Sequence, residues 1–291
     1  MTRRCPNCSQ RSEFEPLFTH IQDTWQCLKC EGWSYFSKQR QSPAELYSES
    51  YFRGGEYVNY EESSRIQKYN FLRKLKILRP FIPPKASARW LEIGSATGTF
   101  FEVLRDYWGI DNNAYLGIEV SEYARNMAKS KKITLYSPFD PQIQVKIKEL
   151  RPNIIAAWDV WEHLETPADT LLNLFAACEA TTYVAITTVD SSSLVAKIRG
   201  SKWRQYHPPT HLNYPSRKSF EIFFSAHSGE ILSHRSFGYY RSAAEYLKIL
   251  RSSGNWLCRH FPILYKTPIY CNLFDTQMVI GSITSALSLR F

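Results

Sequence analysis

Residues 90–101, WLEIGSATGTFF, are the most informative stretch of this chain. A short apolar run ends at Ile93, and a turn bounded by Gly94 and Gly98 leads into a predicted helix that begins near Thr99. Glycine lets a backbone turn sharply and approach a ligand closely. Because open α/β sheets bind cofactors at the carboxyl ends of their strands, this stretch predicts a nucleotide-type binding loop.

The spacing separates this loop from the dinucleotide-binding type. Dinucleotide folds carry Gly-x-Gly-x-x-Gly, which seats a pyrophosphate on the helix N-terminus. Here Gly94 and Gly98 are four residues apart, and Glu92 stands two residues before the first. The next predicted strand ends at Glu119, an acid about 20 residues past the loop, where a carboxylate accepts hydrogen bonds from ribose hydroxyls. The alternative is that Glu119 caps a helix and the glycines form an ordinary turn.

Short apolar runs alternate with helical patterns from Lys85 onward, which predicts an α/β fold with a mostly parallel sheet and helices on both faces. The expected strands are residues 89–93, 115–120, 133–136, 154–158, 183–187, 231–237 and 276–283. The expected helices are residues 61–78, 99–108, 122–129, 143–150, 168–178, 219–226 and 243–251, with loops at 191–194 and 200–209.

Four of the seven cysteines form two close pairs, Cys5-x2-Cys8 and Cys27-x2-Cys30. Two such knuckles predict a small zinc ribbon with all four metal positions filled, so the zinc is expected to be structural. Two disulfides are the first alternative, but no apolar signal region follows Met1, which favours a reducing compartment. A redox pair is the second alternative. The ribbon has few basic residues, which favours a structural role over nucleic-acid binding.

Composition bounds the classes of protein that remain. With 291 residues, of which 44% are hydrophobic, the chain can bury a large core. No apolar run reaches the ~18 residues of a membrane span, so the protein is expected to be cytoplasmic. The net charge of +9 is spread over scattered lysines. This pattern indicates a soluble protein with a lysine-rich face rather than a dedicated anionic partner such as nucleic acid.

The loop and Glu119 together resemble the class I S-adenosylmethionine-dependent methyltransferases, and within them the group related to the ubiquinone-biosynthesis O-methyltransferases. The resemblance covers residues 90–214 best. It implies that Glu92, Gly94 and Gly98, with Ser95 in the same loop, surround the methionine part of the cofactor, and that Glu119 holds the ribose. Many relatives read Gly-Cys-Gly-x-Gly here, and this chain does not. The family's adenine-contacting acid has no clean match, and Asp140 is the nearest candidate.

A second segment, residues 157–164 (AWDVWEHL), is similar to the family's acid-x-x-Glu-His motif. The resemblance implies that it lies beside the transferable methyl group, with Asp159 as a cofactor-binding candidate. His163 is a candidate base for a substrate hydroxyl. Asp159, Glu162 and His163 share one side of a helical turn and could instead bind a divalent cation. The remaining alternative is that the two acids cap the following helix while His163 packs on the loop.

A third cluster, residues 203–212 (WRQYHPPTHL), resembles a histidine-rich loop of the zinc-ribbon subgroup and is expected to form part of the substrate wall. His207 and His211 are candidate bases, or else members of a proline-stiffened structural loop. The tyrosine-rich residues 47–60 are expected to close over the site or to pack between ribbon and core. The predicted domains are a zinc ribbon at 1–36, a linker and covering helix at 37–85, and the cofactor-binding domain at 86–291.

The predicted function is methylation of a small molecule, with O-methylation of a sugar, a lipid-linked intermediate or an aromatic metabolite ahead of N- or C-methylation. Two other hypotheses stay open. One is a methyltransferase that modifies RNA or protein presented by the ribbon. The other is a non-catalytic binding module that has kept the fold.

Overall fold

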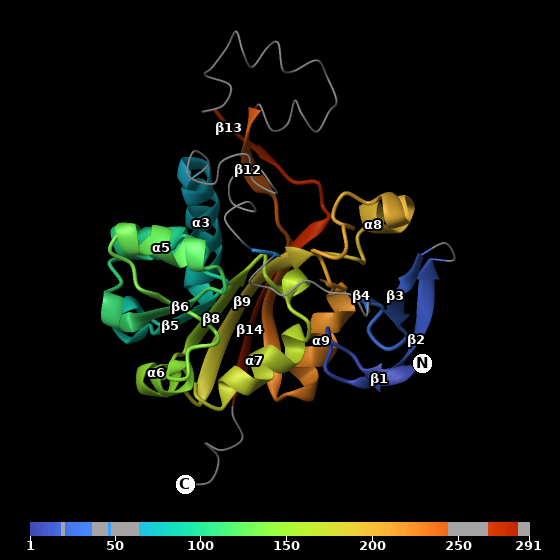
Figure 1. Ribbon diagram of the computed structural model, residues 1–291, viewed down its shortest axis with the longest axis horizontal. Helices are drawn as coiled ribbons and strands as arrows, with labels where there is room; N and C mark the ends of the chain where they lie inside the picture. Colours follow the sequence, from blue (N-terminus) through green and yellow to red (C-terminus); the bar gives the residue numbers. More distant parts are fainter. Residues whose placement is uncertain (19–20, 37–45, 48–63, 244–266, 285–291) are drawn as a thin grey trace.

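The computed structural model describes residues 1–18, 21–36, 46–47, 64–243 and 267–284, and it is built around a seven-stranded sheet (Figure 1). In spatial order the strands are β11 (Gly229–Ser236), β14 (Thr276–Thr284), β9 (Thr181–Val189), β8 (Ile154–Trp158), β5 (Trp90–Ile93), β6 (Tyr115–Ile118) and β7 (Leu135–Tyr136). The pairings from β9 through β7 are parallel, and β14 runs antiparallel between β9 and β11.

Helices cover both faces of this sheet. One face carries α3 (Ser64–Leu78), α4 (Thr99–Val103) and α5 (Glu122–Ser130), and the other carries α6 (Ile143–Leu150), α7 (Pro167–Phe175) and α9 (Arg217–Ala226). Every residue of β5 and β8 is buried. Continuously apolar runs suit parallel strands that are covered on both sides. The predicted Rossmann-like α/β class is therefore confirmed.

Strand order reverses at β5, because β6 and β7 lie on one side of it and β8 and β9 on the other. Open α/β sheets leave a crevice outside the carboxyl ends of the strands at such a reversal. The loop that follows β5 and the turn that follows β8 both open into this crevice. The two segments singled out in the sequence are therefore neighbours in space.

Several local predictions need correction. Strand β7 has only two residues, Leu135 and Tyr136, instead of the four expected over 133–136. The helix expected over 99–108 changes at Leu104 to a wider turn over Leu104–Trp108. Residues 191–193 form the predicted loop, but the short helix that follows it, α8 (Leu194–Arg199), was not predicted. The Ser193 hydroxyl accepts the amide of Ala196 and caps this helix.

Strands β10 (Asn213–Tyr214), β12 (Tyr239–Ser242) and β13 (Pro268–Cys271) were not predicted at all. Each is two to four residues long, too short to show an alternating pattern. The helix predicted over 243–251 lies outside the described residues, apart from Ala243. Most of the tyrosine-rich segment lies outside them too.

The N-terminal ribbon is an antiparallel sheet of β1 (Thr2–Arg4), β2 (Arg11–Phe18), β3 (Ile21–Cys27) and β4 (Trp33–Tyr35), seen in blue at the right of Figure 1. Its fifth strand, β10, comes from the far end of the histidine-rich loop. In this pairing Asn213 lies opposite Ser34 and Tyr214 opposite Trp33. The five-stranded sheet therefore combines four strands of the ribbon with one strand, β10, from the later part of the chain.

Among the helices of the described ranges, none is long and apolar enough to cross a membrane.

The turn after β5 generates a stability prediction. Gly94 has a φ of +71°, and a Cβ at this position would lie 2.4 Å from Cγ2 of Val160. Gly109 has a φ of +65°, but its added Cβ would meet only the mobile end of Lys85. Left-handed backbone costs an L-residue about 1–2 kcal/mol, and overpacking costs about 1–3 kcal/mol more.

We therefore expect Gly94→Ala to lower the free energy of unfolding by about 2–5 kcal/mol, measured by urea titration. The matched control Gly109→Ala should lose only the about 1–2 kcal/mol that the left-handed backbone costs. In the double variant Gly94→Ala/Val160→Ala the clash is removed, so the stability lost to overpacking should be recovered. Equal losses for the two glycine variants would show that Val160 yields without cost.

Candidate active site

One cavity of about 760 Å³ lies at the carboxyl ends of β5, β6 and β8. A volume of this size suits a ligand as large as a nucleotide cofactor. The cofactor-type loop and the histidine-rich loop both contribute to its wall, as do α3 and β12. Its polar lining includes Lys74, Glu92, Ser95, Glu119, Asp159, Glu162, His163, Gln205, His207, His211, Tyr239 and Arg241.

At one end of the cavity, the Glu119 carboxylate holds the glycine loop to the end of β6. It accepts hydrogen bonds from the amides of Ala96 and Ser121, each at 2.8 Å. Burial raises the pKa of Glu119, and these two amides oppose that rise. A carboxylate has about four acceptor positions, so the group retains capacity for a ligand hydroxyl.

Within the loop, Gly94, Ser95 and Ala96 line the cavity, whereas Gly98 does not. Gly98 has a φ of +75°, and a Cβ there would come 3.1 Å from the side chain of Ile133. It therefore serves the turn into α4 and the packing behind it. Its role beside the cofactor stays a prediction, because the cavity lining includes Gly94 and not Gly98.

Glu92 lies under the loop and is fully buried. Its carboxyl group accepts a hydrogen bond from the Tyr115 hydroxyl. Burial raises the pKa of Glu92 to about 8, although the hydrogen bond to Tyr115 acts in the opposite direction. The group is therefore mostly protonated at neutral pH.

Asp140 does not reach the cavity. Its carboxylate accepts the amide of Gln142 at 2.9 Å and so closes the turn before α6. The residues that line the cavity at this point are Pro138, Phe139 and Ile143. The assignment of Asp140 to the adenine site stays a prediction, and one oxygen of its carboxylate is used by this local hydrogen bond.

At the end of β8, Asp159 is held by two groups that the sequence did not single out. Its backbone is left-handed, with a φ of +59°. Its carboxylate lies 3.0 Å from Lys74 Nζ and accepts the Tyr239 hydroxyl. Burial alone would raise the pKa of Asp159, but Lys74 and Tyr239 together outweigh burial and lower it.

Lys74 is 2% exposed in the middle of this contact, and its ammonium group also lies over the rings of Trp158 and Tyr239. A signal for it exists in the sequence. Lys74 falls on the apolar stripe of α3, between Phe71 and Leu78, where a lysine is out of place. Tyr239 follows no such pattern, because it stands on a four-residue strand far along the chain.

The metal-ligand candidates are grouped differently from the prediction. Glu162, His163 and His211 offer ligand atoms that all lie within 4.8 Å of one another. Asp159 does not belong to this group, and His211 takes its place. The two acids do not cap α7 either, because that helix begins at Pro167 with Thr166 before it.

The hydrogen bonds of the two histidines fix their tautomers. Nδ1 of His163 lies 3.0 Å from the carbonyl oxygen of Thr210, and Nδ1 of His211 lies 2.8 Å from that of Gln205. A carbonyl can only accept, so each Nδ1 carries the proton and each Nε2 keeps a free lone pair.

Burial keeps this group uncharged near neutral pH. It lowers the pKa of His163 to about 4 and that of His211 well below its usual value. Burial, followed by the charge of Asp159, raises the pKa of Glu162 to about 8, while Thr188 donates a hydrogen bond to its carboxyl group. His207 stacks on His211 with ring centroids 3.8 Å apart and also lines the cavity.

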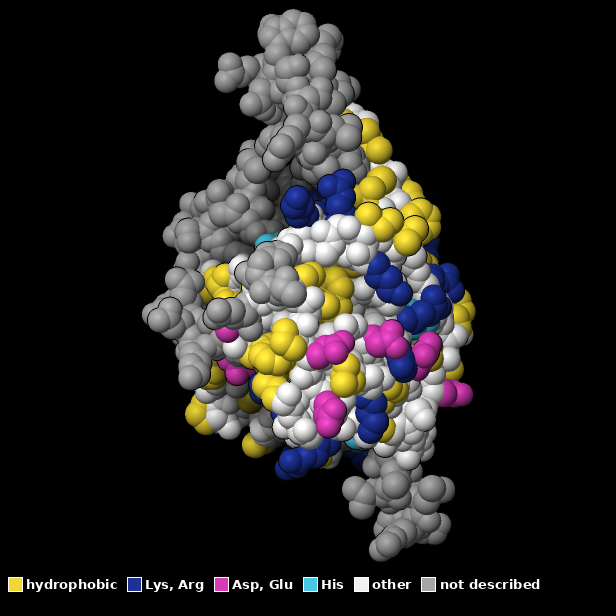
Figure 2. All heavy atoms as spheres, turned by 90° about the vertical axis from the view of Figure 1, so that its right-hand side faces the viewer, with side chains coloured by type: hydrophobic (Ala, Val, Ile, Leu, Met, Phe, Trp, Pro, Cys, Tyr) yellow, Lys and Arg dark blue, Asp and Glu magenta, His cyan; other side chains and the backbone are white. Residues whose placement is uncertain are grey.

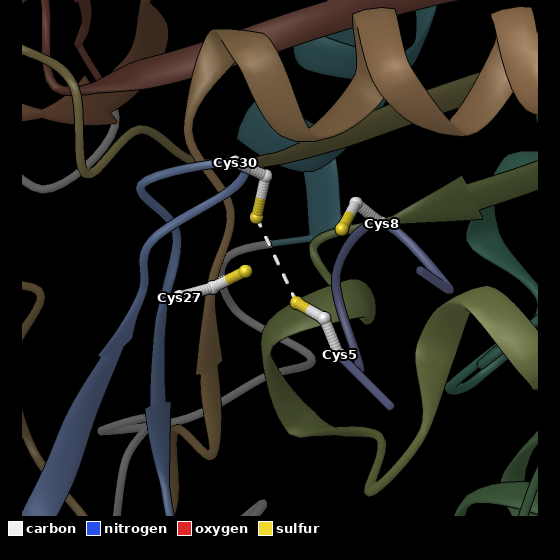
Figure 3. A group of neighbouring side chains, drawn as sticks. All are labelled: Cys5, Cys8, Cys27 and Cys30. Carbon is white, nitrogen blue, oxygen red and sulfur yellow. Dashed lines mark hydrogen bonds between the residues drawn. The ribbon is translucent and has the colours of Figure 1, made fainter. Parts of the chain in front are cut away.

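The four cysteines of the ribbon converge on one point (Figure 3). All four are buried, and their sulfur atoms lie within 4.8 Å of one another. Thiolates held at about 2.3 Å from a tetrahedral zinc would be roughly 3.8 Å apart. The sulfurs of Cys5 and Cys30 are 3.7 Å apart, so the residues present fit a zinc ion.

Comparison with known proteins agrees with this geometry. A family model described as a methyltransferase domain matches residues 64–229. Because the match covers more than half of the chain, the chain belongs to this family, whose members are S-adenosylmethionine-dependent methyltransferases. No curated protein matches the chain in sequence.

Two solved structures are similar in fold. One is the complex between the Haloferax volcanii Trm112 methyltransferase activator and a methyltransferase, with 12% identity, 85% of this chain and 100% of that chain covered, and a TM-score of 0.53. The other is magnesium protoporphyrin IX methyltransferase from Synechocystis PCC 6803 with bound SAH, with 10% identity, 84% and 100% covered, and a TM-score of 0.50. At these identities the likeness concerns the fold alone.

The buried Glu92 generates a prediction of pH dependence. Its pKa rises from 4.5 to about 8 on folding. Between these values the folded state holds a proton that the unfolded state has lost, so stability falls as pH rises, by up to about 1.4 kcal/mol per pH unit. Glu92→Gln keeps an acceptor for Tyr115 and removes this titration.

We expect the free energy of unfolding, measured between pH 5 and 9 without cofactor, to fall less steeply for Glu92→Gln than for the wild type. Glu162 contributes a slope of the same sign to both proteins, so the difference between the two curves isolates Glu92. Substitution of the exposed Glu122 by Gln is the control. Parallel curves for Glu92→Gln and wild type would contradict the assignment.

Proposed function

We propose that the chain transfers the methyl group of S-adenosylmethionine to a hydroxyl group of a small molecule. The observation that carries this proposal is the single cavity that joins the Glu119 loop to three histidines. A cofactor seated at the loop and an acceptor seated at the histidines would meet near Asp159. A sugar, a lipid-linked intermediate or an aromatic metabolite fits the aromatic and polar lining. The narrower resemblance to the ubiquinone-biosynthesis group belongs to this proposal.

The cofactor end of the cavity has the chemistry that an adenosyl group requires. Glu119 would accept the ribose hydroxyls with its remaining lone pairs. Pro138, Phe139 and Ile143 offer an apolar surface for the adenine ring. Gly94, Ser95 and Asp159 would lie around the methionine part, where Lys74 adds a positive charge for its carboxylate.

The sulfonium group supplies an electrophilic methyl, so the difficult chemistry belongs to the cofactor. The chain aligns the acceptor with this methyl group and takes up the acceptor's proton. An attacking hydroxyl becomes strongly acidic as its oxygen bonds to carbon, so a weak neutral base is sufficient. Nε2 of His163 or His211 can accept this proton, and His207 is the third candidate.

The alternatives are less well supported. A methyltransferase that acts on RNA would present a contiguous basic surface. The ribbon-side face in Figure 2 carries Lys and Arg side chains interspersed with Asp and Glu. A non-catalytic module would have no need of a histidine cluster that opens into the cofactor cavity.

We also propose two metal sites of different kinds. The four cysteines would hold a structural zinc with no open position. The Glu162–His163–His211 group would take a divalent cation, since two lone pairs of imidazole and a carboxyl oxygen converge there. Each histidine is already oriented by a backbone carbonyl, which is typical of metal ligands. In that case the cation would lower the pKa of the acceptor hydroxyl, and the histidines would not serve as bases.

Calorimetric titration tests the cofactor proposal. We expect the wild type to bind S-adenosylhomocysteine, and Glu119→Ala to bind it about 10- to 100-fold more weakly, the effect of removing a hydrogen bond to a charged group. The control Glu122→Ala, an exposed acid three residues away, should match the wild type. A wild-type protein that takes up neither the cofactor nor its demethylated product would overturn the proposal.

Metal analysis tests the two sites separately. Protein purified without chelator should contain about one zinc per chain. Cys8→Ser should lose this zinc, and His211→Ala should keep it. Uptake of a second divalent ion, such as Mn²⁺, should disappear in His211→Ala and persist in His227→Ala, a histidine remote from the cavity. Absence of zinc from the wild type would refute the ribbon site.

A further inference from the structure

We propose that Asn7 is a positioning residue through which the four-cysteine ribbon fixes two walls of the cavity. The first wall is the turn that carries Glu162 and His163, and the second wall is the histidine-rich loop that carries His207 and His211. Asn7 stands inside the first knuckle, between Cys5 and Cys8, and is fully buried. The proposal rests on hydrogen bonds among buried groups. It does not depend on which molecule accepts the methyl group.

The side chain of Asn7 joins the ribbon to the turn that carries Glu162 and His163. Its Nδ2 donates to the carbonyl of Trp33 at 3.1 Å, and its Oδ1 accepts the indole N–H of Trp161 at 3.1 Å. An indole can only donate and a carbonyl can only accept, so the orientation of the amide is determined. Trp161 immediately precedes Glu162, so this hydrogen bond holds the turn with Glu162 and His163, the first wall, against the ribbon.

The knuckle also holds the far end of the same wall. The backbone carbonyl of Pro6 accepts the amide of Ala168 at 3.1 Å, in the first turn of α7. Residues 161–168 are therefore attached to the knuckle at both ends. The Trp161 ring also packs against Phe220 of α9, with ring centroids 5.0 Å apart and an interplanar angle of 57°.

A second path leads from Asn7 to the histidine-rich loop. Asn7 Nδ2 lies 3.3 Å from Ser34 Oγ, which donates to Asn213 Oδ1 at 2.9 Å. Asn213 in turn donates to the carbonyl of Leu164 at 2.6 Å. This series of hydrogen bonds therefore connects the ribbon to β10, and β10 to Leu164 beside His163.

Backbone hydrogen bonds close this circuit. The amide of Tyr35 in β4 donates to the carbonyl of Leu212, and the amide of Leu212 donates to the carbonyl of Glu162, each at 2.7 Å. The residues beside His163 and His211 are thus bonded to each other and to the ribbon. A displacement of the ribbon moves both walls together.

Little space surrounds Asn7. A Cβ added at Gly32 would come 3.1 Å from Asn7 Nδ2 and 2.8 Å from Ser219 Oγ. Ser216, which caps α9, also donates to the carbonyl of Cys30. With its partners fixed on both sides, Asn7 has one position, which is what a positioning residue requires.

Amide hydrogen exchange measured by NMR tests this proposal on the full chain. We expect Asn7→Ala to speed exchange of the Leu212 amide about tenfold or more, the size of effect that follows from loss of one buried hydrogen bond. Trp161→Phe removes only the indole donor and should have a similar effect. Amides of β8 should keep their protection in both variants, which shows that the central sheet remains folded.

Ser9→Ala is the matched control, because Ser9 belongs to the same knuckle and is equally buried. Its hydroxyl bonds to His227 at 2.7 Å, away from the cavity. Ser9→Ala should leave Leu212 exchange within about twofold of the wild type, well inside the effect of one hydrogen bond. If Asn7→Ala does not fold, Trp161→Phe decides the question alone. Exchange at Leu212 that is no faster in these variants than in Ser9→Ala would overturn the proposal.

A failure of the proposed function gives a different result. If the wild type does not bind S-adenosylhomocysteine, the exchange data still report whether Asn7 holds the two walls. If it does bind, both Asn7→Ala and Trp161→Phe should bind within about twofold of the wild type, since neither residue contacts the Glu119 end of the cavity.

Discussion

The parallel pairing of β5 with β8 is the constraint on which the site depends. It places Ile93 beside Ala157, so the turns that follow the two strands leave the sheet together. Gly94 and Val160 then meet so closely that a Cβ on Gly94 would lie 2.4 Å from the valine. The cofactor-type loop, Asp159 and the histidine wall are all arranged around this contact.

Burial decides the chemistry that these groups can perform. Glu92 and Glu162 both have raised pKa values, and His163 and His211 have lowered ones, chiefly because the protein removes them from water. Asp159 is the exception, because Lys74 and Tyr239 stabilise its charge. Asp159 and Lys74 therefore form an ion pair at the end of β8, beside the uncharged group of Glu162, His163 and His211.

The sequence was most informative where chemistry and local pattern coincide. The glycine turn with Glu119, the two cysteine pairs and the five main parallel strands could all be predicted, because each depends on residues close together in the chain. Gly98 and Asp140 stay predicted cofactor residues, although neither belongs to the cavity lining. Lys74, Tyr239, Asn7 and Asn213 were missed, since their roles depend on partners between 26 and 179 residues away. Lys74 interrupts the apolar stripe of α3, but no local pattern indicates which partners these four residues have.

The position of β14 has a consequence for how the chain folds during synthesis. Residues 276–284 pair with β9 on one side and with β11 on the other, so among the described strands β11 has no neighbour until they arrive. Until then β9 is an open edge, able to pair with another chain. Synthesis must therefore pass residue 284 before this part of the sheet can close. During that interval the unpaired edge of β9 can pair with the edge strand of a neighbouring nascent chain.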